Sequence, residues 1–537
     1  MTRSAGVGAR VALMAVPAVF IGAFFFYPIL TVLWRGLGGG GGETFLDLAA
    51  SSRQRDIVWF TLWQAVASTA LTLAVGIPAA SVVARLPGRR QRMIRALVTV
   101  PFVLPTVVVA GAFTEVFSVT GLDDGAFRFR HTVWAILIAH VFFNYAVVVR
   151  AVGGYWSGLD HRVEEAARVL GARPLAVFRE VTLPRLRPAI ASAASIVFLF
   201  SFTSFGVVLI LGGPRRATLE TEIYRQAVTR TDLETAAALA VVQLVAVLAL
   251  VVMSTRLERR RPVLTRLART SRRPAAPVWR WGNAIVGLVL LGGPIAVLVE
   301  RSLSTGGGYG FDHYTALAER ARQLPAPATT AIGNSIVFAV AATAMAVLVG
   351  SLASLVVVHG RRAASRIFDL GLTLPLGTSA VTIGFGMLIA LDEPPLDLRT
   401  SWWIIPIAHA LVGVPFVVRT MVPVLRSIDP VLHEAAAVLG ATPTRARREI
   451  DLPIGLRGLV VGAGFAFAVS LGEFGATSFL PRRPENLTAP VALFRLLSTP
   501  GDLLRGQAMA LSVVLMVLVA AAVLVIESAR RTEEGVF

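Results

Sequence analysis

EAARVLGARPLAVFREVTLP (residues 165–184) and EAAAVLGATPTRARREIDLP (residues 434–453) are two copies of one segment, 269 positions apart. Both copies begin with Glu-Ala-Ala, carry a glycine at the seventh position and end on Leu-Pro. The same spacing relates further pairs on either side: Trp134 and Trp403, His140 and His409, Arg150 and Arg419, and Phe205-Gly206 and Phe474-Gly475. The chain is therefore an internal duplication, and we expect its two halves to share one fold.

Apolar runs fill most of the chain around these two copies. The residues AVILMFWYC make up 55% of the 537 positions, 15% are charged, and the mean hydropathy is +0.71, whereas soluble domains contain about 25% charged residues. A helix needs about 20 apolar residues to cross a bilayer. Runs of this kind occur at 11–34, 59–84, 96–118, 132–152, 187–213, 235–255, 282–300, 332–358, 367–390, 402–424, 454–480 and 505–527. The sequence thus predicts an all-α polytopic membrane protein with about twelve transmembrane helices.

Six of these runs precede an arginine-rich stretch and six follow it. We therefore expect a first half at residues 1–255, an arginine-rich cytoplasmic linker at 256–281 and a second half at 282–537. An even number of spans per half keeps the two copies in the same orientation. The fold should then be two pseudo-symmetric six-helix halves, with both repeated segments on one side of the membrane.

The placement of charge predicts which side that is. The formal charge is +19, all 51 basic residues are arginine, and they concentrate at 85–95, 256–280 and 361–366. Loops on the other side carry acidic residues, among them Asp123 and Asp392. By the positive-inside rule we expect a multi-pass protein with both termini in the cytoplasm. No nucleic-acid-binding motif accompanies the arginines, so nucleic acid is not an expected partner.

The composition also excludes several kinds of chemistry. The chain has no lysine, which the nucleotide-binding P-loop requires. It has no cysteine, which removes disulfides and thiolate metal sites. Its Ser, His and Asp residues form no recognisable triad, and no HExxH spacing occurs. We therefore expect no catalytic residues, no metal site and no cofactor bound by this chain.

Each repeated segment, which we call an EAA segment, is predicted to form two short helices. Glu165 stands near a helix N-terminus, where a carboxylate suits the dipole, and the two alanines after it leave room for a partner surface. Gly171 stands where the helix would turn, and Pro174 suits the first turn of a second helix. The alternative is an amphipathic helix at the lipid surface, but two copies in equivalent loops favour a shared docking role.

The pattern E-A-A-x₃-G-x₉-I-x-L-P, with Val181 in place of Ile in the first copy, resembles the EAA loop of bacterial ABC-importer permeases. The resemblance implies an ABC type I importer-like fold in the bacterial inner membrane. It also implies two protein partners, a homodimeric ABC ATPase that hydrolyses ATP and an extracytoplasmic solute-binding protein. In that family the loop is the coupling helix that docks on the ATPase. The residues that match are Glu165, Ala166, Ala167, Gly171, Glu434, Ala435, Ala436 and Gly440.

The fused arrangement of six plus six spans is similar to that of the thiamine and iron(III) importer permeases. The stretches LWQAVASTA (62–70), LIAHVFFN (137–144) and FTSFGVVLILGGPRRATLETEIYRQA (202–227) resemble the thiamine type. SLGEFGATSFL (470–480) carries Glu473 where the thiamine type usually has Asp, and its Glu-Gly-Ala-Thr pattern resembles the iron type. The resemblance favours thiamine, with iron(III) as the alternative and another small solute, such as a polyamine, after these.

Four residues are candidates for the translocation path. Glu473 lies within the eleventh run, where an ionisable group indicates function by default; the alternative is a hydrated carboxylate near the outer interface or one paired with arginine. Ser204 is its counterpart in the first half. His140 and His409 are equivalent to each other, and a buried histidine hydrogen-bonded across helices is the alternative to a lining role.

Two other classes of protein compete with this interpretation. An ion-coupled secondary transporter of two six-helix halves should carry ionisable residues deep in several spans, and we identify only Glu473. Such a transporter would also leave the two EAA segments unexplained. A membrane-embedded enzyme would need a catalytic constellation, which the sequence does not offer.

Overall fold

The computed structural model describes residues 14–38, 45, 47–48, 50–123, 129–213, 215–259, 276–360, 368, 371–372, 374–375, 378–392, 396–480 and 483–534. Nearly all of its regular structure is helical, and the strands among these residues form one small antiparallel hairpin, β1 (Ser304–Thr305) with β2 (Gly308–Tyr309). Ten helices in the described residues are long and apolar enough to cross a membrane, and a bent pair makes an eleventh. The prediction of an all-α polytopic membrane protein is confirmed.

The first half begins with an apolar helix over Met14–Leu37 that contains η1 and α2. Its elements are η1 (Gly22–Phe26), α2 (Tyr27–Leu37), α4 (Ser52–Val83), α5 (Gly88–Val103), α6 (Thr106–Val119), α7 (Val133–Ser157), α8 (Arg162–Val169), α9 (Pro174–Ala176), η2 (Val177–Thr182), α10 (Leu183–Phe202), α11 (Gly206–Leu211), α12 (Leu219–Tyr224), η3 (Arg225–Thr229) and α13 (Leu233–Arg259).

The second half repeats this order of long helices. Its elements are α14 (Pro277–Gly287), η4 (Leu288–Gly292), α15 (Gly293–Leu303), the β1–β2 hairpin, α16 (Asp312–Thr315), η5 (Ala316–Ala318), α17 (Ala328–His359), α19 (Ala380–Ala390), α20 (Ile404–Arg426), α21 (Pro430–Val438), α22 (Pro443–Ala446), η6 (Arg447–Asp451), α23 (Leu452–Gly472), α24 (Gly475–Phe479), η7 (Pro484–Asn486), α25 (Ala489–Leu497) and α26 (Asp502–Glu534).

A helix occupies each of the twelve predicted runs, but several of the runs are not simple spans. The third is the pair α5 and α6, which bend by 93°, because Leu104 precedes Pro105 and takes the extended conformation that a following proline favours. The ninth is described as a helix only over α19. Most of the predicted linker (residues 260–275) and the arginines of 361–366 lie outside the described residues, so the proposed domain boundaries stay a prediction.

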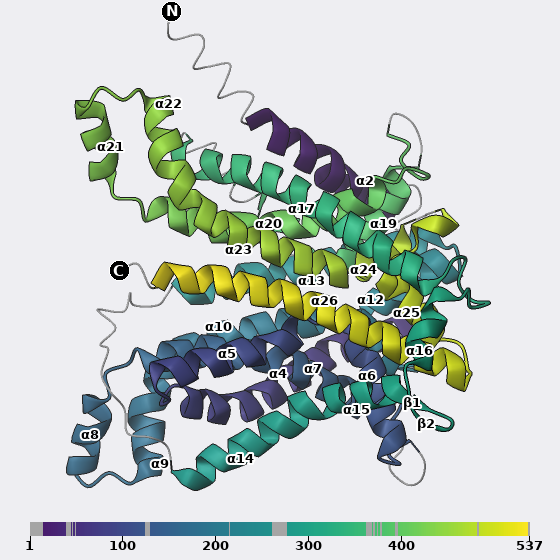
Figure 1. Ribbon diagram of the computed structural model, residues 1–537, viewed down its shortest axis with the longest axis horizontal. Coiled ribbons are helices and arrows are strands. Elements are labelled where there is room, and N and C mark those ends of the chain that lie inside the picture. The colour runs from purple at the N-terminus through teal and green to yellow at the C-terminus, as the bar shows by residue number, and fades with distance from the viewer. Residues whose placement is uncertain are drawn as a thin grey trace, which may run out of the picture.

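Each half contains the same three-helix bundle, α4 with α7 and α10 in the first, and α17 with α20 and α23 in the second (Figure 1). Equivalent glycines allow α4 to approach α7 closely in the first bundle and α17 to approach α20 closely in the second. A Cβ on Gly76 would lie 2.7 Å from Val148, and a Cβ on Gly350 would lie 2.8 Å from Val417. The duplication seen in the sequence is therefore also a duplication of packing.

The first helix of each half packs both on the last helix of its own half, α13 or α26, and on the other half. Ile21 and Phe25 belong to a hydrophobic cluster of the second half, which includes Met387 of α19. Leu291 and Ile295, from η4 and α15, pack on a cluster of the first half around Phe142 and its neighbours. The two halves are therefore interlocked.

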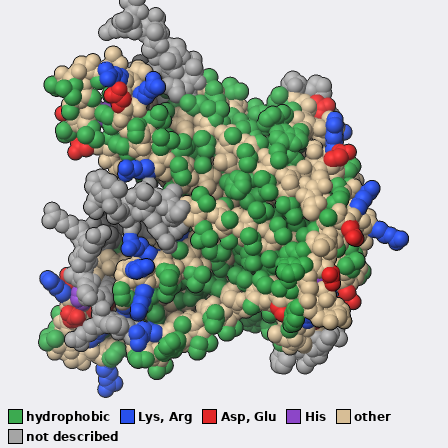
Figure 2. All heavy atoms as spheres, viewed as in Figure 1, with side chains coloured by type: hydrophobic (Ala, Val, Ile, Leu, Met, Phe, Trp, Pro, Cys, Tyr) green, Lys and Arg blue, Asp and Glu red, His purple; other side chains and the backbone are tan. Residues whose placement is uncertain are grey.

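Charge is segregated along the bundle. Hydrophobic side chains cover the middle of the face seen in Figure 2, whereas charged side chains gather at its two ends. The helices α8 and α21 lie at one of these ends, which we call the EAA end, and the β1–β2 hairpin lies at the opposite end (Figure 1). An apolar belt between two polar ends suits a bilayer.

Candidate functional site

Each EAA segment begins with a short helix at the EAA end, as predicted, but the prediction of a second, separate short helix is wrong. The π-helical turns η2 and η6 carry the second helix past Leu183-Pro184 and Leu452-Pro453 into the long helices α10 and α23. In the first segment, α8 is followed by a turn at Gly171 with φ of +86°, and α9 and η2 lead back to α10. In the second, α21 is followed by a turn at Gly440 with φ of +79°. Both turns use the left-handed region, which glycine enters without the steric cost that other residues meet.

In each segment, an equivalent side-chain contact joins the helix before the glycine turn to the helix after it; we call these two helices the arms of the segment. The Thr182 hydroxyl donates to the Glu164 carboxylate at 3.0 Å in the first segment. At the same two places in the second segment, His433 Nε2 lies 2.8 Å from the Asp451 carboxylate. The residue types differ while the positions of the contact are kept, which indicates that both segments require the same relative placement of their arms.

The most exposed parts of both segments are apolar. Val169 and Leu170 in the first segment are 86% and 87% exposed, and Val438 and Leu439 in the second are each 86% exposed. We call these two pairs the tips. Sequence analysis concentrated on the Glu-Ala-Ala positions and missed the tips, although the shared Val-Leu before each glycine was visible.

The matching EAA residues lie beside the tips. Ala166 and Ala435 are exposed, and their neighbours Ala167 and Ala436 are half-buried. Glu165 lies 3.8 Å from His161, one helical turn earlier. A docking role for these residues stays a prediction.

A second candidate site lies where the two halves meet. The long helix α10 ends at Phe202 and α23 ends at Gly472, and a short helix follows each after a break. Phe205 and Phe474 occupy these breaks at equivalent positions, and their rings stack across the halves with centroids 5.4 Å apart. The predicted fifth and eleventh runs therefore each contain a break that hydropathy did not reveal.

Glu473 is buried beside this stack and bonds to the protein. Its carboxylate accepts hydrogen bonds from the backbone N–H of Ala476 at 2.8 Å and of Thr477 at 3.0 Å, and from the Thr477 hydroxyl. His409 Nε2 lies 3.3 Å away. Glu473 thus stabilises the start of α24, and the titratable side chain beside it is His409, not the arginine or bulk water that we considered. Contact with cargo stays a prediction.

The two candidate histidines are buried and bonded across helices, as the alternative predicted. His140 Nδ1 in α7 lies 2.8 Å from the Ser68 hydroxyl in α4, and His409 Nδ1 in α20 lies 2.7 Å from the Ser470 hydroxyl in α23. Ser204 is half-buried and immediately precedes Phe205. Of the four candidates, the structure brings Glu473 and His409 together and places Ser204 beside the stack.

Sequence analysis also missed the buried carboxylates Glu115, Glu220 and Glu222. Glu115 lies within the third predicted run, so the statement that only Glu473 is ionisable within a span is wrong, whereas Glu220 and Glu222 lie between two runs. Glu115 lies in α6 and accepts from Arg505 Nε at 3.1 Å across the two halves. Glu220 accepts from Gln243 Nε2 at 2.5 Å and from the Ser379 hydroxyl at 3.0 Å.

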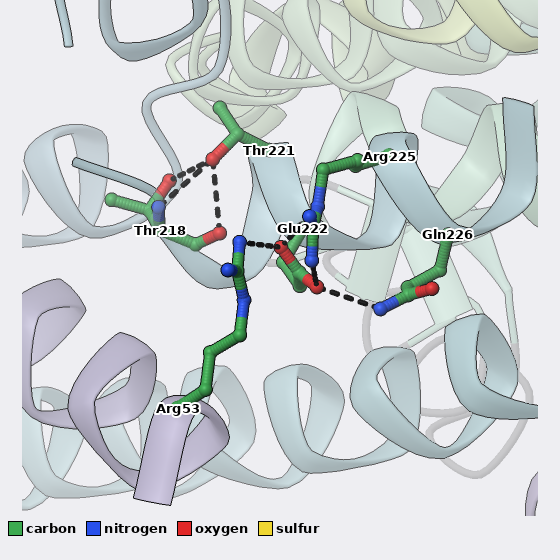
Figure 3. A network of polar contacts seen from close by, with 6 residues as sticks. All are labelled: Arg53, Thr218, Thr221, Glu222, Arg225 and Gln226. Atoms are coloured by element: carbon green, nitrogen blue, oxygen red, sulfur yellow. Dashed lines mark hydrogen bonds and ion pairs between the residues drawn. The ribbon is translucent and has the colours of Figure 1, made fainter. Parts of the chain in front are cut away.

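Glu222 is the third of these carboxylates. It accepts from Arg225 Nε at 2.8 Å and from Gln226 Nε2 at 2.7 Å, with Arg53 at 3.9 Å (Figure 3). Thr218 and Thr221 form a capping box at the start of the same helix, α12. Each of the three carboxylates therefore has a polar partner, which accounts for its burial.

Two parallel halves, each with a long-helix bundle and an exposed helical segment at one end, define a transport permease. Residues 74–261 and 346–530 each match the family of binding-protein-dependent transport system inner membrane components, and together they cover more than half of the chain. The chain belongs to this family. It is the multi-pass inner-membrane permease subunit of an ABC importer, which is a subunit without catalytic activity.

Relatives of known type agree with this assignment. A thiamine transport system permease protein of Brucella abortus (strain 2308) is 30% identical over 93% of this chain and 92% of its own length. A probable ABC transporter permease protein of Sinorhizobium fredii is 26% identical over 88% of this chain and 87% of its own. A putative 2-aminoethylphosphonate transport permease of Salmonella paratyphi A is 27% identical over 43% of this chain and 86% of its own.

Proposed function

We propose that this permease imports thiamine. The observation that carries the proposal is the similarity to the Brucella thiamine permeases, which runs through both halves and covers 93% of the chain. The aromatic cluster at the junction of the halves supports it, because a flat heteroaromatic cation stacks well on aromatic rings. Iron(III) is the alternative cargo, based on the sequence around Glu473.

We propose further that the tips dock on an ABC ATPase, one subunit under each half. Both tips carry two large apolar residues that are exposed, and they belong to the segments of α8 and α21 at the EAA end (Figure 1). Such exposed apolar surfaces mark protein contacts. The two segments share one order of helices and one type of glycine turn, which favours two identical ATPase subunits. The flanking Glu165, Gly171, Glu434 and Gly440 complete this surface, and the EAA end then faces the cytoplasm.

In the proposed cycle, a binding protein delivers cargo at the opposite end of the bundle. ATP binding closes the ATPase dimer and draws the two EAA segments together. The halves then open toward the outside, accept the cargo and release it inward after hydrolysis. Because α10 and α23 follow the EAA segments directly in the chain, movement of the tips is passed to the breaks at Phe205 and Phe474.

Uptake by whole cells tests the cargo. A deletion strain and its complemented parent are compared for labelled thiamine, iron(III) and 2-aminoethylphosphonate in parallel. We expect only thiamine uptake to depend on the permease. Dependence of iron(III) or 2-aminoethylphosphonate uptake alone would overturn the proposed cargo and leave the family assignment unchanged.

Co-purification tests the docking surface. The double variant Leu170→Asp with Leu439→Asp places charges on both tips and should abolish co-purification of the ATPase at unchanged membrane abundance. Tyr309→Asp is the matched control, because Tyr309 is 76% exposed but lies in the β1–β2 hairpin at the opposite end. Retention of the ATPase by the double variant would refute docking at the tips.

A further inference from the structure

Phe205 and Phe474 meet on the symmetry axis of the permease. They are equivalent residues of the two halves, so the pseudo-two-fold axis that exchanges the halves must pass between them. The two residues are 6% and 2% exposed. Their ring planes lie within 21° of parallel, the offset-stacked arrangement that aromatic pairs favour. A solute that travels along this axis cannot pass unless the two rings separate.

The backbone around the stack is held closely on both sides. A Cβ on Gly206 would lie 3.3 Å from the Phe474 ring, and it would also collide with Thr106 at the start of α6. At the equivalent place, a Cβ on Gly475 would lie 3.1 Å from Ala380 at the start of α19. The break at Phe205 therefore packs on the start of α6, and the break at Phe474 packs on the start of the equivalent helix, α19.

Other aromatic rings from both halves surround the pair. Tyr224 lies 5.4 Å from Phe205 and 5.4 Å from Phe479, and Phe494 lies 5.3 Å from Phe474, measured between ring centroids. The carboxylate of Glu473, the residue before Phe474, is engaged by backbone N–H groups and lies beside His409. The surface that would be uncovered when the pair separates is therefore dominated by aromatic faces.

We propose that the Phe205–Phe474 stack seals the translocation path, and that its separated ring faces bind a flat, cationic heteroaromatic cargo during passage. The second part rests on the proposed function. Ring faces attract organic cations and stack on heteroaromatic rings, whereas a small inorganic ion keeps its water shell and gains less from them. The stack thus both closes the translocation path and selects the cargo.

Leakage through the resting permease tests the seal. The complete transporter is reconstituted in liposomes loaded with labelled thiamine and labelled mannitol, without ATP. We expect wild-type protein to retain both solutes and Phe205→Ala with Phe474→Ala to release them. Retention by a correctly inserted double-alanine variant would overturn the seal. Mannitol makes this result independent of whether thiamine is the cargo.

Conservative variants test the contact with cargo. Phe205→Leu with Phe474→Leu keeps apolar bulk, so liposomes should stay sealed, while KM for thiamine should rise about tenfold because the π contacts are lost. Phe113→Leu is the matched control, since Phe113 pairs with Phe142 inside the first half, with centroids 5.6 Å apart. An unchanged KM in the double-leucine variant would overturn the cargo contact, and thiamine transport by wild-type protein would show that the proposed function stands.

Discussion

Glu473 illustrates how a buried carboxylate in a membrane protein can be explained by backbone contacts. Two N–H groups at the start of α24 and the Thr477 hydroxyl donate to it, and His409 lies within ionic range. Sequence analysis identified Glu473 because it interrupts an apolar run. It could not identify the role of Glu220, because the Ser379 hydroxyl that binds it lies 159 positions away in the other half.

We expect Glu473→Ala to destabilise the protein. The substitution leaves buried N–H groups without an acceptor, and each such group costs about 1–3 kcal/mol, so the thermal unfolding temperature in detergent should fall. Glu473→Gln keeps one acceptor and should lose less. The control is Glu485→Ala, whose side chain is exposed in η7. Loss of uptake at an unchanged unfolding temperature would instead assign Glu473 to the cargo.

At the scale of elements, regular helices were predictable and their interruptions were not. Hydropathy located a helix in each of the twelve runs because a span must be apolar over its whole length. The breaks at Phe205 and Phe474 are short and lie between longer apolar stretches, so the hydropathy averaged over a span stays high across them. The turns of the EAA segments were predictable, because Gly171 and Gly440 mark a helix end.

Those turns support a prediction about backbone conformation. Gly171→Ala with Gly440→Ala places side chains at φ of +86° and +79°, which costs about 1–2 kcal/mol at each residue. The tips should shift, and ATPase co-purification should fall without loss of inserted protein. Neither glycine has a neighbour within 4 Å of its added Cβ, and the same is true of Gly333 in α17, where φ is ordinary. Gly333→Ala is therefore the matched control, and an equal effect there would contradict the argument.

At the scale of the whole molecule, the duplication extends from the sequence to the packing of the two halves. The glycine-to-valine contacts of Gly76 and Gly350 recur, as do the ties within the EAA segments. The contacts of each first helix with the other half were not predictable. The apolar sequence of a helix does not indicate which half the helix packs on.

Parallel halves require that both tips face the same side of the membrane. The chain has no cysteine, so single cysteines can be introduced without background. In inside-out vesicles from cells without the ATPase, Val169→Cys and Val438→Cys should react with a membrane-impermeant maleimide, and in intact spheroplasts they should stay unlabelled. Tyr309→Cys, at the opposite end of the bundle, should show the reverse pattern. Labelling of the two tips from opposite sides would mean that the second half is inverted, and neither the positive-inside assignment nor docking of one ATPase dimer on both tips could then hold.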